Sequence, residues 1–339
     1  MQWDVFCRVI DNHGDVGVCW RLAAQLASRG EAVRLWVDDA SALAWMAPDG
    51  AAGVELRHWA EPFDAPQPGD VVIEAFGCDP PAGFVSRMAA STTPPVWINL
   101  EYLSAEAYVE RSHGLPSPLQ HGPGRGLVKW FFFPGFTPAT GGLLRGPLAT
   151  ADRGWLASVG ATPRADERVV SVFAYADAPF AEFFERLADR PTLLLAAAGA
   201  GQAPAIAALR QRPHRHLRHV ALPRLTQADY DRLLAACDLN VARGEDSIVR
   251  AMWAGVPFVW HIYRQDDGAH ERKLDALLER MNADVALRSL WRAFNRLGPW
   301  SVPLPEDAPW RTLCRHWRDT LLAQSDLTSR LLAFVASKR

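Results

Sequence analysis

Several patterns that would assign a common function are missing from this chain of 339 residues. Its five cysteines include no C-x-x-C pair, which excludes a disulfide framework and the usual zinc spacings and fits a reducing compartment. It contains no Walker A loop, nucleophile elbow or H-E-x-x-H helix, so these nucleotide, hydrolase and metalloprotease sites are not indicated. The most apolar long stretch, residues 193–209, contains Gln202 and Pro204 and falls short of a membrane span.

The start of the chain lacks a basic segment followed by an apolar one, so we expect no secretory signal, no membrane contact and a cytoplasmic protein. The net charge of −2 argues against a dedicated nucleic-acid binder. The charge is unevenly divided, because residues 1–150 hold 10 basic and 16 acidic side chains, against 26 and 22 in residues 151–339. This predicts a cationic partner for the first half and an anionic one for the second.

Strands and helices are expected to alternate along both halves. We predict strands at residues 3–10, 33–37, 71–75, 96–100, 169–173, 192–196, 219–222, 239–241 and 258–262. Helices are predicted at 41–46, 181–187, 227–236, 248–254, 270–280 and 320–335, with another after the loop that follows the first strand. Residues 112–165 are rich in Pro and Gly and are interpreted as long loops plus a linker.

This alternation indicates an α/β protein with parallel sheets. We predict two Rossmann-like domains that face each other across a cleft, with ligands at the carboxyl ends of the strands. The domains are expected at residues 1–155 and 156–319, and a C-terminal helix within residues 320–339 is expected to pack back on the first domain. The length agrees with two domains of ordinary size.

The first candidate site is the loop D-N-H-G-D-V-G at residues 11–17, between the first strand and the first helix. Its glycines permit tight turns, but two carboxylates, Asp11 and Asp15, do not suit a phosphate. The loop therefore favours a cationic or hydroxyl-bearing group, with one acid as base and the other as orienter. The alternative is that Asp15 caps the helix and Asp11 forms an Asx turn.

The second candidate site is R-G-E-D-S at residues 243–247, again between a strand and a helix. Unpaired N–H groups at the helix start and the guanidinium of Arg243 predict a diphosphate site. Capping alone would explain Asp246 and Ser247, but not a strand that ends in Arg-Gly-Glu. Residues 261–270 follow another strand and form a credible rim of the same site.

A metal site is not predicted. Asp229-Tyr230-Asp231 has the D-x-D spacing, but Thr226 before it is typical of a helix N-cap, and acids favour the first turn of a helix. The segment Gly199-Ala200-Gly201 lacks the rest of a dinucleotide fingerprint, which disfavours a nicotinamide-dependent oxidoreductase. We therefore expect no metal and no cofactor.

Six segments together resemble one bacterial family. The longest, FCRVIDNHGDVGVCWRLA at residues 6–23, closely resembles the protein-arginine rhamnosyltransferases that modify elongation factor P. The further matches are NLEYLSAE at 99–106, FFPGF at 132–136, TGGLL at 140–144, RGEDS at 243–247 and HIY at 261–263. Matches to this family extend from residue 3 to about residue 275, and together they are far more specific than any one of them.

The resemblance implies a GT-B glycosyltransferase that moves L-rhamnose from dTDP-β-L-rhamnose to an arginine of elongation factor P, with inversion at the anomeric carbon. It also implies that the first domain holds the acceptor protein and the second the nucleotide sugar. The family's essential acids fall on Asp11, Asp15 and Glu245. Its donor-binding positions are expected at Asn12, Gly14, Gly17, Phe173, Tyr175, Gln227, Tyr230, Arg243, Asp246, Ser247, Tyr263 and Gln265.

The chemistry of the residues agrees with this implication. A guanidinium has a pKa above ~12 and is a poor nucleophile, so its glycosylation needs carboxylates that hold the cation and accept its proton. Two alternatives remain open at this point. One is a GT-B transferase for a small-molecule or lipid-linked acceptor, and the other is a non-catalytic module that binds a translation factor.

Overall fold

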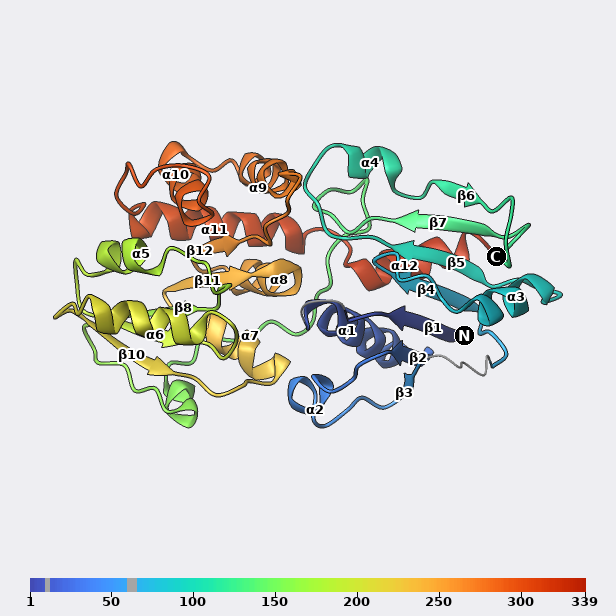
Figure 1. The fold of residues 1–339 in the computed structure, drawn as a ribbon, viewed down its shortest axis with the longest axis horizontal. Coiled ribbons are helices and arrows are strands. Elements are labelled where there is room, and N and C mark those ends of the chain that lie inside the picture. Colours follow the sequence, from blue (N-terminus) through green and yellow to red (C-terminus); the bar gives the residue numbers. More distant parts are fainter. Residues whose placement is uncertain (10–12, 60–65) are drawn as a thin grey trace. The chain divides into compact units, whose positions relative to one another are not determined.

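The computed structural model describes residues 1–9, 13–59 and 66–339, which form two compact units (Figure 1). The first unit contains Met1–Gly146 and Gln324–Arg339, and the second unit contains Pro147–Ala323. The division therefore falls earlier than the predicted boundary at residue 155, and the chain returns to the first unit at its C-terminal end.

The first unit is built on a seven-stranded sheet in the order β3-β2-β1-β4-β5-β7-β6. Its strands are β1 (Gln2–Cys7), β2 (Ala32–Val37), β3 (Val54–His58), β4 (Val71–Ala75), β5 (Val96–Leu100), β6 (Pro116–Pro118) and β7 (Val128–Phe132). All neighbouring pairs are parallel except β6 and β7. Strands β4 and β5 are buried along their whole length, as their mostly apolar sequences lead one to expect, and each also buries one polar residue, Glu74 in β4 and Asn99 in β5.

Helices of the first unit pack on this sheet. They are α1 (Gly14–Ser28), α2 (Leu43–Met46), α3 (Ala82–Ala90), α4 (Tyr108–Ser112) and α12 (Leu327–Ala336). Leu22 and Leu26 of α1 share one buried core with Leu331 and Val335 of α12. The Arg29 guanidinium after α1 also donates to Asp326 before α12 at 2.7 Å. The end of the chain is thus part of the core of the first unit.

Two predictions about secondary structure were wrong. Residues 320–335 do not form one helix: α11 (Asp307–Leu322) ends first, and α12 begins after Asp326, whose carboxylate accepts the Ser329 backbone N–H at 3.0 Å. Residues 112–165 are not only loops, because they contain β6 and β7. The aromatic run Trp130-Phe131-Phe132-Phe133-Pro134-Gly135-Phe136 therefore begins within β7, where Phe132 is completely buried.

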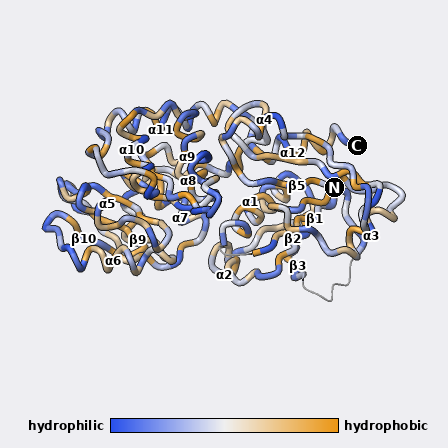
Figure 2. Tube along the Cα trace, turned by 45° about the horizontal axis from the view of Figure 1, so that its top comes forward, coloured by the Kyte–Doolittle hydropathy of each residue, from blue (hydrophilic) through white to orange (hydrophobic). Residues whose placement is uncertain are grey.

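The second unit contains a five-stranded, wholly parallel sheet in the order β10-β9-β8-β11-β12. Its strands are β8 (Arg168–Val172), β9 (Thr192–Ala196), β10 (Leu217–Ala221), β11 (Leu239–Arg243) and β12 (Phe258–His261). Besides α11, its helices are the 3-10 helix η1 (Gly154–Val159), α5 (Phe180–Leu187), α6 (Gln202–Gln211), α7 (Gln227–Ala236), α8 (Gly244–Ala254), α9 (Ala269–Arg280) and α10 (Val285–Phe294). In both units hydrophobic and hydrophilic residues follow one another along the helices, as amphipathic packing requires (Figure 2).

Each sheet has one point where the strand order reverses. It lies between β1 and β4 in the first unit and between β8 and β11 in the second. In doubly wound sheets ligands bind beyond the carboxyl ends of the strands at such a point. Within the described residues, no helix combines the length and apolarity needed to cross a membrane.

Candidate active site

In the second unit, predicted site residues gather at the carboxyl ends of three strands around the reversal point. Phe173 and Tyr175 follow β8, Arg243 is the last residue of β11, and Tyr263 follows β12. The strands are in parallel register, with Arg243 beside His261 and the Phe173 N–H donating to Val241 at 3.0 Å. Side chains that are distant in the sequence therefore project from one edge of the sheet.

Arg243 lies between two of these aromatic rings. Its guanidinium carbon is 4.5 Å from the ring centre of Phe173 and 5.0 Å from that of Tyr175. Burial lowers the pKa of Arg243 below its usual range, although the group remains a cation. Its Nη1 is buried and has no hydrogen-bond acceptor among the described residues. A half-buried cation with a buried donor of this kind is suited to bind an anion, because each unmade hydrogen bond is costly.

The start of α8 lies beside this guanidinium. Gly244 adopts a left-handed φ of +67°, and its carbonyl accepts the Trp260 indole N–H at 2.9 Å. Arg243 occupies the N-cap position without a side-chain cap. The backbone N–H groups of the first turn and the positive end of the helix dipole therefore add to the charge of Arg243. Asp246 and Ser247 lie inside the first turn and are not the cap.

Glu245 in the same turn forms an ion pair with Lys273 of α9. Both side chains are largely buried, with 24% and 16% of their surface exposed. The ammonium group offsets a negative charge that would otherwise repel an anion at the helix start. Lys273 was missed by the sequence analysis, because nothing along the chain distinguishes it from the other charged residues of α9.

His261, the last residue of β12, holds the backbone of Tyr175. Its Nδ1 accepts the Tyr175 backbone N–H at 3.1 Å, and the two rings meet edge to face at 5.2 Å. Burial lowers the pKa of His261 to about 4, so the imidazole is neutral at neutral pH. The Tyr175 ring also meets Tyr263 edge to face at 5.7 Å. These three residues form one packed group beside Arg243.

Tyr230 completes the aromatic wall from α7. Its ring meets Phe173 edge to face at 5.6 Å. Burial raises the pKa of its hydroxyl, which has no hydrogen-bond partner among the described residues. Of the other predicted donor residues, Gln227 is the first residue of α7, and the Gln265 backbone N–H donates to His270 at 3.2 Å. Both residues thus belong to segments that flank the site.

Gly199 and Gly201 do not complete a dinucleotide fingerprint, but both lie where an added side chain would come close to neighbouring atoms. A Cβ on Gly199 would lie 3.1 Å from the Phe173 ring and 3.6 Å from the Arg243 guanidinium. A Cβ on Gly201 would lie 2.3 Å from the Ala174 carbonyl oxygen, which leaves no room for a side chain. The close approach of this turn to β8 explains why glycine is needed here.

The D-x-D segment of α7 behaves as expected for a helix start. Thr226 is the N-cap residue of α7 and accepts the Asp229 backbone N–H at 3.0 Å. In the described part of the chain, no three His, Cys, Asp or Glu side chains lie together in a way that could hold a metal ion. That the reaction needs no metal and no cofactor stays a prediction.

The first unit carries the other predicted acids. Gly14, Asp15 and Gly17 lie in the first turn of α1. The N-cap residue is His13, so the alternative that Asp15 caps the helix is wrong. The Tyr102 hydroxyl lies 3.5 Å from Asp15 Oδ2. Asp11 and Asn12 lie outside the described residues.

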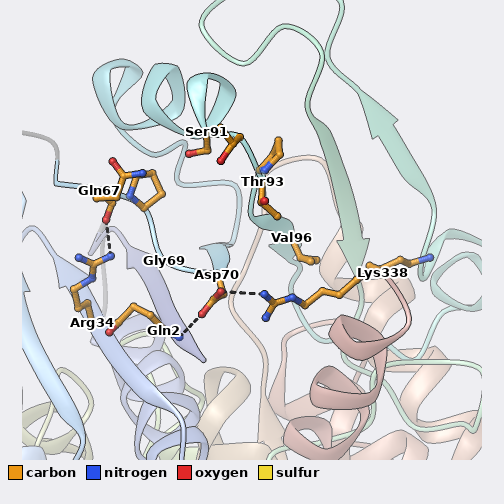
Figure 3. Close-up of a pocket in the computed structure, with 13 residues that line it drawn as sticks. Gln2, Arg34, Gln67, Gly69, Asp70, Ser91, Thr93, Val96 and Lys338 are labelled. Carbon is orange, nitrogen blue, oxygen red and sulfur yellow. Dashed lines mark hydrogen bonds and ion pairs between the residues drawn. The ribbon is translucent and has the colours of Figure 1, made fainter.

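A separate hollow of about 790 Å³ lies at the opposite edge of the first sheet, at the amino ends of β1, β4 and β5 (Figure 3). Among the predicted site residues that the structure describes, none lines it. The Arg34 guanidinium is paired with the buried Asp4 at 2.7 Å, and the Arg339 guanidinium with Asp70 at 3.0 Å. Because these arginines are already neutralised by acids, this hollow does not resemble an anion site.

Comparison with known proteins agrees with the geometry. The family model for elongation factor P (EF-P) rhamnosyltransferase EarP matches residues 3–336. A protein-arginine rhamnosyltransferase of Pseudomonas putida is 42% identical, with 98% of each chain covered. A solved structure that describes EarP-mediated arginine glycosylation of EF-P aligns over 100% of this chain and 99% of its own, with a TM-score of 0.66 and 30% identity. The calicheamicin glycosyltransferase CalG4, at 16% identity and a TM-score of 0.54, shares the fold alone. The chain therefore belongs to the EarP family, a family of protein-arginine rhamnosyltransferases with the GT-B fold.

Proposed function

We propose that the chain transfers L-rhamnose from dTDP-β-L-rhamnose to one arginine side chain of EF-P, with inversion at the anomeric carbon. One observation carries the donor half of this proposal: Arg243 is a half-buried cation whose buried Nη1 has no acceptor among the described residues, and it lies at the start of α8. The family membership supports the acceptor half, because EF-P is the protein that the EarP family model names.

The donor is assigned to the second unit. The diphosphate would accept hydrogen bonds from Arg243 and from the N–H groups at the start of α8, which stabilise the negative charge of the leaving dTDP. The edge-to-face pair of Phe173 and Tyr230 offers apolar ring surface for the thymine base. Glu245, held by Lys273, is assigned to positioning of the sugar.

The acceptor is assigned to the first unit. The arginine nitrogen attacks the anomeric carbon, the C–N bond forms as the bond to the diphosphate oxygen breaks, and one guanidinium proton passes to a carboxylate. We assign this proton to Asp15, at the start of α1, and the orientation of the guanidinium to Asp11. A single displacement of this kind inverts the anomeric configuration. General-base catalysis contributes typically 10²–10⁴-fold to the rate.

Mass spectrometry tests the proposal directly. EF-P is incubated with the purified chain and dTDP-β-L-rhamnose, and the expected product carries one added deoxyhexose on a single arginine. Reactions without the enzyme, with dTDP-glucose, and with EF-P in which that arginine is replaced by Lys serve as controls. Unmodified EF-P, together with transfer to a small-molecule acceptor, would instead support a transferase of different acceptor class.

A further inference from the structure

Two aromatic rings of the first unit form a stacked pair next to Asp15. Phe76 follows β4 and Tyr102 follows β5, and their ring centres are 4.5 Å apart with an angle of 17° between the planes. The Tyr102 side chain is 41% exposed, whereas Phe76 is half-buried and packs against the core of the first unit. Phe76 therefore supports Tyr102 from the protein side.

The backbone of Phe76 adopts a conformation that bulky residues rarely take. Its φ is +58°, in the left-handed region, where a residue with a large side chain is strained. The Phe76 N–H donates to the Leu100 carbonyl at 2.7 Å, which ties the turn to the end of β5. Strain of this kind persists where the surrounding structure holds it, and it clusters at functional sites.

A hydrogen-bond network fixes Tyr102 in the same way. The Asn99 side chain accepts the Gly77 backbone N–H at 3.2 Å and donates to the Glu101 carboxylate at 2.7 Å. Glu101 directly precedes Tyr102 in the chain. The turns that carry both rings are thus attached to one side chain, Asn99. The arrangement is rigid before any ligand binds, as a recognition site requires.

We propose that the outer face of Tyr102, supported by Phe76, binds the guanidinium group of the acceptor arginine while Asp15 accepts hydrogen bonds from its N–H groups. This inference rests on the proposed function and names the residues that select arginine. A guanidinium is flat and weakly hydrated, so it stacks on an aromatic face and still donates in its own plane to a carboxylate. The lysine ammonium is compact and strongly hydrated and lacks this flat face. The aromatic platform of Tyr102 and Phe76 would therefore favour arginine over lysine.

A double-mutant cycle isolates this contact. The dissociation constant is measured without donor for the wild-type chain and for Tyr102→Leu, each with EF-P that carries either the acceptor arginine or Met in its place. For the wild type, replacing the arginine weakens binding. In Tyr102→Leu the ratio of the two constants is expected to fall about 3- to 30-fold, the range of a cation–π contact. Tyr102→Phe should restore the wild-type ratio, because it retains the ring.

Tyr108→Leu is the matched control. Its side chain is 42% exposed in the same unit, but its ring meets Phe133 edge to face and is not part of the stacked pair. This variant can weaken docking of EF-P as a whole, yet it should leave the arginine-to-Met ratio unchanged. If Tyr102→Leu does not fold by circular dichroism, Tyr102→Gln takes its place.

Different results would overturn the aromatic platform and the proposed function. Equal ratios in the wild type and Tyr102→Leu, with normal rhamnosylation of EF-P by the wild type, would overturn the aromatic platform alone. The platform would be overturned equally if Tyr108→Leu lowered the ratio as much as Tyr102→Leu does. Absence of any modified EF-P with the wild type would overturn the proposed function itself.

Discussion

The two units carry candidate site residues of opposite charge on a similar arrangement of strands. Both sheets contain the order of a doubly wound fold, and both place candidate site residues at the carboxyl edge beside the reversal point. In the first unit that edge carries Asp15 and a stacked aromatic pair, which suit a cation. In the second unit it carries Arg243 between aromatic rings, which suits an anion. The sheet determines where a site forms, and a few residues after the strands determine its charge.

The largest expected effect comes from removing the negative charge of the first unit. Asp15→Asn should lower kcat by about 10²–10⁴-fold, because the variant cannot accept the proton of the guanidinium. Binding of dTDP, measured by titration calorimetry, should stay within about twofold of the wild type, because the residues proposed to hold the diphosphate and the base, Arg243, Phe173 and Tyr230, lie in the second unit. Glu55→Gln on β3 is a suitable control, because Glu55 is 53% exposed and forms an ion pair with Arg57. Near-normal turnover by Asp15→Asn would exclude Asp15 as the base.

The second prediction concerns the neutral histidine beside the donor edge. Because the pKa of His261 is about 4 when folded and about 6.5 in a model peptide, the unfolded chain binds more protons between these values. The contribution of His261 to stability is therefore present above pH 6.5 and is lost as the pH falls toward 4, by roughly 3 kcal/mol. His261→Asn keeps an acceptor for the Tyr175 N–H but does not titrate. The free energy of unfolding is measured with urea at several pH values between 7 and 4, for the wild type and for His261→Asn. It should fall less steeply with decreasing pH in the variant. An equally steep fall in both proteins would contradict the neutral, buried state of His261.

A smaller effect is expected when the cation of the second unit is removed. Arg243→Met should weaken dTDP binding by about 10- to 100-fold, the range of a lost charge-assisted hydrogen bond. Its affinity for EF-P in the absence of donor should not change, which would sharpen the contrast between the units. Arg232→Met is the control, because Arg232 also lies over an aromatic ring, that of Trp155, but is 48% exposed. Loss of EF-P binding in Arg243→Met, with dTDP binding intact, would reverse the assignment of the units.

The buried strands of both units could be predicted from the sequence because they are short, mostly apolar segments. The strands at Val71–Ala75, Val96–Leu100 and Thr192–Ala196 have the predicted bounds. The same holds for the helix Gln227–Ala236, whose Thr226 cap is visible in the sequence. The positions Phe173, Tyr175 and Tyr263 were implied by the family resemblance, and the parallel strands bring them to the edge where Arg243 lies.

Features that depend on distant partners could not be predicted in this way. The aromatic run at the end of β7 resembles a loop anchor until β5 is placed beside it. The role of Lys273 depends on the fold, because α9 places its side chain in an ion pair with Glu245. Tyr102 is part of a matching segment, but its stacking on Phe76 arises from a strained turn that no residue pattern marks. In each case the missing information is a contact between segments far apart in the sequence.

The return of α12 to the first unit has a consequence for synthesis on the ribosome. The core of that unit includes Leu331 and Val335, which follow the whole of the second unit in the chain. The strands of the first unit are therefore made long before its core can be completed, because all of Pro147–Ala323 is synthesised in between. A nascent chain that stops before residue 327 would leave the apolar surface around Leu22 and Leu26 uncovered, where it is open to chaperones and proteases.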